Sequence, residues 1–179
     1  MSDRRALLLR ATKYFAGISL LALLFVSLDF LIDFKPASIQ SSYRFSLREL
    51  PVDRPVWLRQ DNLVIVVIHR SPRLIEALTQ ADDRLQDPDS KSSRQPQYAK
   101  NRLRSRSAAY FVAYGRGTDF ECPLESGNGE ILRETCGGAQ YDFAGRALAG
   151  KNQFQNLAIP DYTFNDNFTL LTINPWGDR

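Results

Sequence analysis

The longest apolar segment of the chain lies near its N-terminus, over residues 14–28. Its fifteen residues carry no charge and read YFAGISLLALLFVSL. Four basic residues precede it, namely Arg4, Arg5, Arg10 and Lys13. A helix of fifteen residues rises about 22 Å, short of the roughly 30 Å hydrocarbon core of a bilayer, so a membrane span has to be longer. The pattern predicts a basic N-terminus over residues 1–13 and a single transmembrane helix over residues 14–33.

The charges around this segment also predict its orientation. Basic residues on the N-terminal side favour a cytoplasmic N-terminus and export of the remainder. A cleaved signal peptide is the alternative, because the apolar run alone has that length. The acidic and bulky stretch Asp29–Lys35 offers no small-residue cleavage site, which favours a retained anchor. The pair Arg4-Arg5 also resembles a twin-arginine export signal.

Beyond the anchor the pattern changes to short runs that are typical of strands. Residues 34–42 (FKPASIQSS) lack periodicity and predict a tether, so a folded domain is expected over residues 43–175. The expected strands are YRFSL, PVWLRQ and LVIVVIHR around a polar turn, AYFVAYG, NLAIPDYTF and FTLLTI. One short helix is predicted at residues 71–80, where Leu74, Ile75 and Leu78 share a face. The fold class is therefore mainly β.

Composition and charge exclude some functions. The chain has 179 residues and a net charge of +3, too small to indicate nucleic-acid binding. Between residues 90 and 106 lies a second basic cluster without acids: Lys91, Arg94, Lys100, Arg102, Arg104 and Arg106. A solvated surface connection is the preferred interpretation, and a docking patch for an acidic partner is the alternative.

Three segments of the chain resemble one known family. QDPDSKSSRQPQYAKNRLRS is similar to the linker of the Rieske iron-sulfur subunit of proteobacterial ubiquinol-cytochrome c reductase. CGGAQYDFAGR looks like its second cluster loop, and the last two expected strands look like its closing strands. The resemblance implies a Rieske-like small antiparallel sandwich or barrel in the periplasm, anchored in the bacterial inner membrane. Residues 116–150 would be a degenerate cluster-binding subdomain.

A Rieske centre holds one iron by two Cys thiolates and the other by two His nitrogens. Laid on the family's two loops, the four ligand positions of this chain are Gly117, Asp119, Glu134 and Gly137. None of them is Cys or His, and the one histidine, His69, lies in an expected strand. The resemblance therefore implies vestigial ligand positions, no metal and no catalytic residue.

The two cysteines, Cys122 and Cys136, fall on the family's disulfide positions, so the resemblance implies that they pair. Chain-entropy models give about 3 kcal/mol for such a loop. Two unrelated free thiols are the alternative. The retained family residues are Tyr141, Asp142 and Gly145, whereas Ala139 replaces a serine and residues 150–155 replace a proline-rich loop. Without a ligand thiolate to bond, Tyr141 is expected to be a strand-edge aromatic.

Other chemistry remains open. A different metal could use Asp119, Glu134, Cys122 and Cys136, but binding through the thiols would cost the disulfide. A thiol-disulfide oxidoreductase would need a Cys-x-x-Cys spacing, which the chain lacks. With one histidine and no Gly-x-Ser-x-Gly motif, nothing indicates a hydrolase.

The sequence thus predicts a non-redox Rieske-like subunit, or an assembly or stabilising factor, of a respiratory membrane complex related to ubiquinol-cytochrome c reductase. It would contain no cofactor, and its head would be docked in one position. Its expected partners are the membrane and cytochrome b and cytochrome c1 or a true Rieske subunit, with no nucleic acid. The alternative is a functional 2Fe-2S subunit that transfers electrons from quinol to cytochrome c1.

Overall fold

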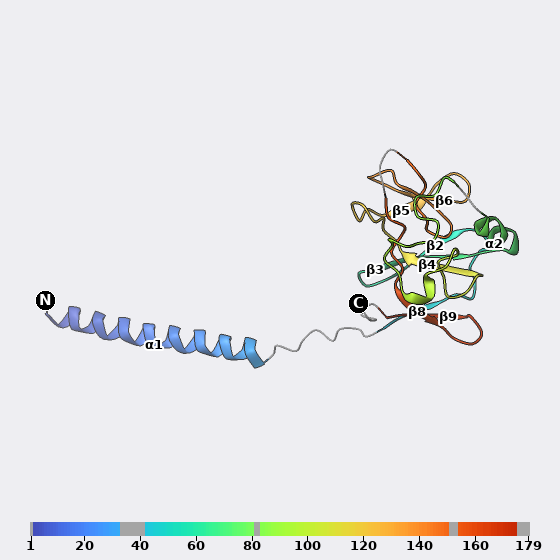
Figure 1. Ribbon diagram of the computed structural model, residues 1–179. Coiled ribbons are helices and arrows are strands. Elements are labelled where there is room, and N and C mark those ends of the chain that lie inside the picture. Colours follow the sequence, from blue (N-terminus) through green and yellow to red (C-terminus); the bar gives the residue numbers. More distant parts are fainter. Residues whose placement is uncertain (1, 33–41, 81–82, 151–153, 175–179) are drawn as a thin grey trace. The chain divides into compact units, whose positions relative to one another are not determined.

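The computed structural model describes residues 2–32, 42–80, 83–150 and 154–174 (Figure 1). The chain divides into two compact units, residues 1–40 and 41–179. Of the predicted tether, only Ser42 belongs to the described residues.

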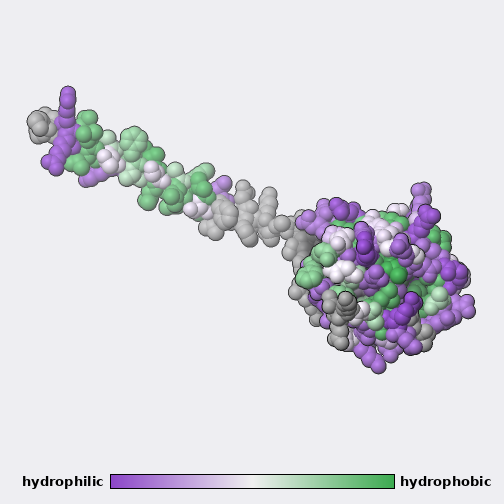
Figure 2. All heavy atoms as spheres, turned by 90° about the horizontal axis from the view of Figure 1, so that it is seen from above, coloured by the Kyte–Doolittle hydropathy of each residue, from purple (hydrophilic) through white to green (hydrophobic). Residues whose placement is uncertain are grey.

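The first unit is a single helix, α1, Ser2–Ile32. Its stretch from Arg4 to Asp29 has 26 residues and is long and apolar enough to cross a membrane. That length corresponds to about 39 Å, more than the roughly 30 Å that a bilayer requires. Green spheres dominate this helix in Figure 2. The hydroxyls of Thr12 and Ser27 donate to backbone carbonyls one turn earlier, which satisfies them within the helix.

The helix begins at Ser2 rather than at Tyr14, so the basic N-terminal residues are part of it. Residues 4–10 (RRALLLR) are good helix formers, which explains the extension.

The second unit contains three antiparallel sheets of three strands each among its described residues. One has the order β1-β9-β8, with β1 Tyr43–Ser46, β8 Asp161–Phe164 and β9 Leu170–Asn174. The next has the order β2-β3-β4, with β2 Pro55–Gln60, β3 Leu63–His69 and β4 Tyr110–Tyr114. The last has the order β5-β6-β7, with β5 Leu124–Ser126, β6 Ile131–Glu134 and β7 Gln140–Asp142.

The centre of the core is β3, which pairs with a strand on each side. Ile65, Val66, Val67 and Ile68 are all fully buried, as expected for a strand covered on both faces. The hairpin β2–β3 turns at Asp61 and Asn62, which confirms the predicted turn.

The predicted short helix is α2, Pro72–Thr79. Ser71 caps its start by accepting a hydrogen bond from the Leu74 N–H, and proline is favoured at the first helical position. Leu74 and Leu78 are buried, so the helix packs by the face that the sequence indicated. A short 3₁₀ turn, η1, Gln97–Ala99, follows in the linker.

The interpretation of the basic linker as a solvated connection is wrong for Arg104, whose side chain is fully buried. Its guanidinium donates to the carbonyl oxygens of Gly145 and Leu157, at 2.8 and 2.7 Å, and to the side chain of Gln95. Burial lowers the pKa of Arg104 to about 10, so it stays charged at neutral pH. The loop carbonyls supply the hydrogen bonds that water would otherwise provide. Arg104 therefore ties the linker to the segments around Gly145 and Leu157.

Candidate functional site

The two loops singled out by the sequence lie next to each other in the structure. Loop 1, residues 115–123, follows β4, and loop 2, residues 135–139, joins β6 to β7. Within loop 1 the Gly117 N–H donates to the Cys122 carbonyl at 2.8 Å. Between the loops the Thr135 N–H donates to the Pro123 carbonyl at 3.0 Å. The β5-β6-β7 sheet holds both loops in register.

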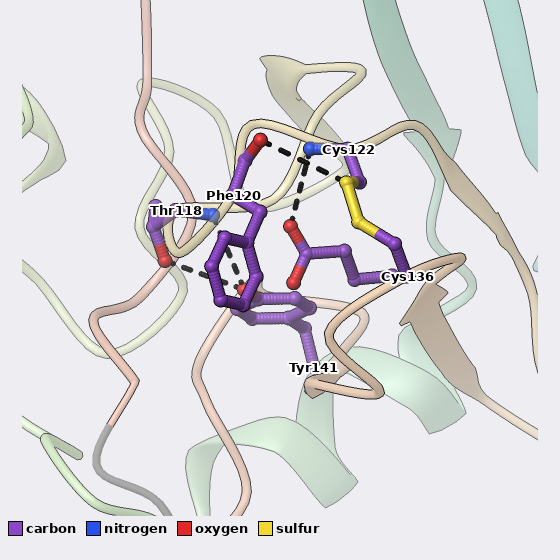
Figure 3. The surroundings of a disulfide bond; sticks show 6 residues. Thr118, Phe120, Cys122, Cys136 and Tyr141 are labelled. Atoms are coloured by element: carbon purple, nitrogen blue, oxygen red, sulfur yellow. Dashed lines mark hydrogen bonds between the residues drawn. A yellow bond between two sulfur atoms is a disulfide. The ribbon is translucent and has the colours of Figure 1, made fainter.

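A disulfide joins Cys122 of loop 1 to Cys136 of loop 2, which confirms the pairing implied by the resemblance (Figure 3). The two Cα atoms are 6.1 Å apart, within the usual range for a disulfide. Cys122 is half-buried and Cys136 is exposed. The bridge therefore fixes the outer side of the two loops and is open to solvent.

The side chain of Glu134 fills the space between the loops. It lies at the end of β6 and is only 1% exposed. A Cβ atom added at Gly117 would overlap the Glu134 carboxyl group, and one added at Gly137 would lie 2.7 Å from its Oε2 atom. Gly117 and Gly137 thus both lie against the carboxylate of Glu134, which is itself a vestigial ligand position. Because the two glycines have no side chains, they leave room for it.

The carboxylate of Glu134 is only partly compensated. Its Oε1 atom accepts a hydrogen bond from the Cys122 N–H at 3.3 Å (Figure 3). Its Oε2 atom is buried and has no hydrogen-bond partner among the residues that the structure describes. A buried carboxylate oxygen without a donor is unfavourable by at least about 1–3 kcal/mol.

The fourth vestigial position, Asp119, is exposed on loop 1. Its Oδ2 atom would lie 3.4 Å from a Cβ atom at Gly137, so it borders the same space as Glu134 Oε2. Phe120 follows it, with 67% of its surface exposed. The tip of loop 1 therefore presents a carboxylate and an aromatic ring to solvent.

Tyr141 links loop 1 to β7. As expected it lies on an edge strand, but its side chain is fully buried rather than at the surface. Its hydroxyl lies 3.3 Å from both the N–H and the Oγ1 of Thr118 (Figure 3). Burial raises the pKa of Tyr141, so the phenol is neutral at physiological pH. The neutral hydroxyl of Tyr141 therefore holds loop 1 through its hydrogen bonds with Thr118.

Asp142 and Gly145 shape the turn that follows β7. Asp142 accepts hydrogen bonds from the N–H groups of Ala144 and Arg146, both at 2.9 Å, and forms an ion pair with the buried Arg146 side chain. Gly145 has φ +67°, a conformation that favours glycine. A Cβ atom there would also lie 2.5 Å from the Phe111 ring. These retained residues have structural roles that require no metal.

His69 lies on β3 and belongs to neither loop. Its ring stacks on Tyr110 of β4, with the ring centroids 4.7 Å apart. The four vestigial positions offer two carboxylates and no sulfur or imidazole. This donor set does not fit a Rieske centre, which needs two thiolates and two imidazoles.

Sequence reasoning missed a groove of about 960 Å³ beside loop 1. It is lined by the linker around Arg94 and Tyr98, by Tyr114 and Arg116, and by residues 158–161. Arg116 is paired with Glu121 at 3.5 Å. No sequence pattern indicated this groove, because its walls come from four separate segments, the fourth being Asn174 of β9.

Comparison with known proteins identifies a relative of the chain. No protein-family model matches it. A ubiquinol-cytochrome c reductase iron-sulfur subunit from Allochromatium vinosum is 32% identical over 129 residues, which cover 66% of this chain and 58% of that protein. This similarity supports a divergent Rieske-like protein. The chain therefore spans less than two thirds of the length of this relative.

Two solved structures are also similar to this chain. A chain of a hyperthermophilic respiratory complex III has a TM-score of 0.48 and 10% identity, over 90% of this chain and 96% of that one. The ferredoxin of carbazole 1,9a-dioxygenase from Nocardioides aromaticivorans has a TM-score of 0.40 and 10% identity, over 75% of this chain and 98% of that one.

Proposed function

We propose that this Rieske-like protein is a non-redox subunit, or an assembly or stabilising factor, of a respiratory membrane complex related to ubiquinol-cytochrome c reductase. The observation that carries the proposal is the Glu134 side chain, which fills the space between loops where the resemblance places cluster ligands. A carboxylate is a poor substitute for the two thiolates and two imidazoles that hold a Rieske cluster. The head would keep its shape without inorganic iron and sulfide.

The interactions that hold the loops support a scaffold role. The disulfide and the Tyr141–Thr118 contact fix the loops through protein groups alone, and the Asp142–Arg146 pair fixes the turn after β7 in the same way. The loops can therefore keep their conformation without a metal, as a non-redox subunit requires.

The tip of loop 1 is the proposed contact with the partner complex. Phe120 is the most exposed large apolar side chain among the described residues of the second unit. Exposed aromatic residues are enriched where proteins associate. The proposed partners are cytochrome b and cytochrome c1, or a true Rieske subunit that this chain accompanies or replaces.

The membrane placement of the proposal follows from α1. Basic residues at its start favour a cytoplasmic N-terminus, with the second unit in the periplasm of a bacterial inner membrane. An exposed disulfide is compatible with that oxidising compartment.

The decisive experiment measures iron and its electronic state in the full chain, purified in detergent from cells that assemble a cluster into an intact Rieske subunit expressed in parallel. We expect the intact subunit to give a Rieske electron paramagnetic resonance signal and this chain to give none, with substoichiometric iron. Two irons per chain with that signal would instead establish a functional electron-transfer subunit.

The partner is tested separately by affinity purification from solubilised membranes. We expect subunits of a quinol-cytochrome c reductase to be recovered with the chain, and Phe120→Ser to reduce their yield. Val52→Ser is the control, because Val52 is an exposed apolar residue of the second unit outside loop 1. Recovery that depends equally on both residues, or on neither, would contradict docking through loop 1.

A further inference from the structure

The two sulfur atoms of the disulfide and the carboxylate of Glu134 form one cluster of potential metal ligands. One ligand atom from each of Cys122, Glu134 and Cys136 lies within 4.8 Å of the other two. In a tetrahedral zinc site, with Zn–S near 2.3 Å and Zn–O near 2.1 Å, neighbouring ligand atoms are about 3.4–3.8 Å apart. The carboxylate is therefore within reach of an ion held by the two sulfur atoms, which are bonded to each other in the disulfide and have to separate to about 3.8 Å once it is reduced.

Glu134 provides the second observation. The side chain is 99% buried, and its Oε2 atom has no hydrogen-bond partner among the described residues. A buried carboxylate is stabilised by pairing with a cation or by coordinating a metal. The unpartnered oxygen faces the space beside Gly137, which the exposed carboxylate of Asp119 also borders. Two carboxyl groups therefore border this space, and carboxylate oxygens are among the ligands that cations of the zinc class accept.

We propose that reduction of the Cys122–Cys136 disulfide creates a binding site for one thiophilic divalent cation of the zinc class. Its ligands are the Sγ atoms of both cysteines and the carboxylate of Glu134, and water completes the tetrahedron. This site differs from a Rieske centre, because it uses the two cysteines at the disulfide positions and no imidazole. It does not depend on the identity of the partner complex.

The chemistry requires a reductant, which is a dithiol of the kind that reduces exposed protein disulfides. The dithiol gives up two electrons and two protons and becomes a disulfide, while Cys122 and Cys136 become two thiols. Cation binding then displaces both thiol protons. Cys136 is exposed, so the reductant can reach the bond while Glu134 stays buried. A bound cation would link the two loops in the reduced state as the disulfide links them in the oxidised state.

The test uses the full chain in detergent, with the disulfide either intact or reduced by a phosphine that is then removed. Co²⁺ is titrated into both forms, and thiolate-to-cobalt charge-transfer absorption reports sulfur ligation. Zn²⁺ is then added in competition. We expect the reduced chain to bind one Co²⁺ with thiolate bands, Zn²⁺ to displace it, and the oxidised chain to show no such bands.

Glu134→Gln tests the third ligand, because the amide keeps the shape and can still accept from the Cys122 N–H. We expect it to weaken Co²⁺ binding by at least about tenfold. Glu125→Gln is the control, because Glu125 is a more exposed carboxylate of the same sheet and is paired with Arg133. It should leave the affinity unchanged.

Three results would overturn the proposal: equal cation binding by the oxidised chain, no binding by the reduced chain, or unchanged affinity in Glu134→Gln. Unchanged affinity in Glu134→Gln is also the result expected if the reduced chain unfolds and binds the cation through its two thiols alone. None of these readouts involves iron or a partner, so failure here is distinct from failure of the proposed function.

Discussion

Removing the room that Gly117 leaves for Glu134 tests the central geometry of the site. In Gly117→Ala, the new Cβ atom would overlap the Glu134 carboxyl group, which is buried and confined beside the disulfide. The backbone of Gly117 is not in the left-handed region, so the expected effect is steric alone. In Glu134→Ala the obstructing carboxyl group is absent, and the same substitution should be tolerated.

The magnitude follows from the contacts. Overpacking of a filled site costs about 1–3 kcal/mol, whereas Gly→Ala at an unstrained position stabilises by about 0.4–1 kcal/mol through the unfolded chain. We therefore expect Gly117→Ala to lower the free energy of unfolding by about 1–2 kcal/mol. In the Glu134→Ala background it should be neutral or slightly stabilising. The coupling between the two substitutions is then about 1–3 kcal/mol.

The assay is thermal unfolding of the four proteins of the cycle, followed by tryptophan fluorescence in detergent under oxidising conditions. At roughly 3 °C per kcal/mol, Gly117→Ala should lower the Tm by about 3–6 °C. Gly150→Ala is the control, because a Cβ atom there meets nothing within 4 Å. A wild-type Tm for Gly117→Ala, or an equal loss in both backgrounds, would refute a site filled by Glu134.

Three further predictions concern the same unit. Replacing Cys122 and Cys136 by alanine should lower its stability by about 3 kcal/mol, and phosphine reduction of the wild type should lower the Tm equally while leaving the variant unaffected. Gly145→Ala should cost at least about 1–3 kcal/mol in chemical denaturation, because φ is +67° and the Phe111 ring lies in the way. Burial opposes ionisation of Asp87, but three hydrogen bonds outweigh it and lower its pKa below 3.8. Its contribution is therefore present above pH 3.8 and lost as the pH falls through the lower folded pKa, and Asp87→Asn should flatten the fall in Tm below about pH 4.

The parts of the fold with a strong periodic pattern could be predicted from the sequence. The hairpin of β2 and β3 follows from two β-rich runs around a polar turn, and the helix α2 follows from a proline start and an apolar face. The structure confirms both strands and the helix. The β5-β6-β7 sheet was missed, because strands of three or four residues are too short to show a period. A local sequence pattern does not predict strands this short, because their pairing with neighbouring strands, rather than their own residues, determines that they form.

The candidate site could be predicted only in part. The positions of Cys122 and Cys136 indicated a disulfide through the resemblance, and the structure contains it. That Glu134 would be buried could not be read from its type, because carboxylates are rarely buried without a partner. The same holds for Arg104, which the basic run around it marked as solvated although loop carbonyls surround it. In both cases long-range contacts override the usual preference of the residue.

The position of the Glu134 carboxyl group also constrains any attempt to engineer iron ligands into this chain. A cysteine at position 117 or a histidine at position 137 would place its Cβ atom against that group. Both changes therefore require the Glu134 side chain to move or to be replaced, so the design of an iron site in this chain would begin at position 134.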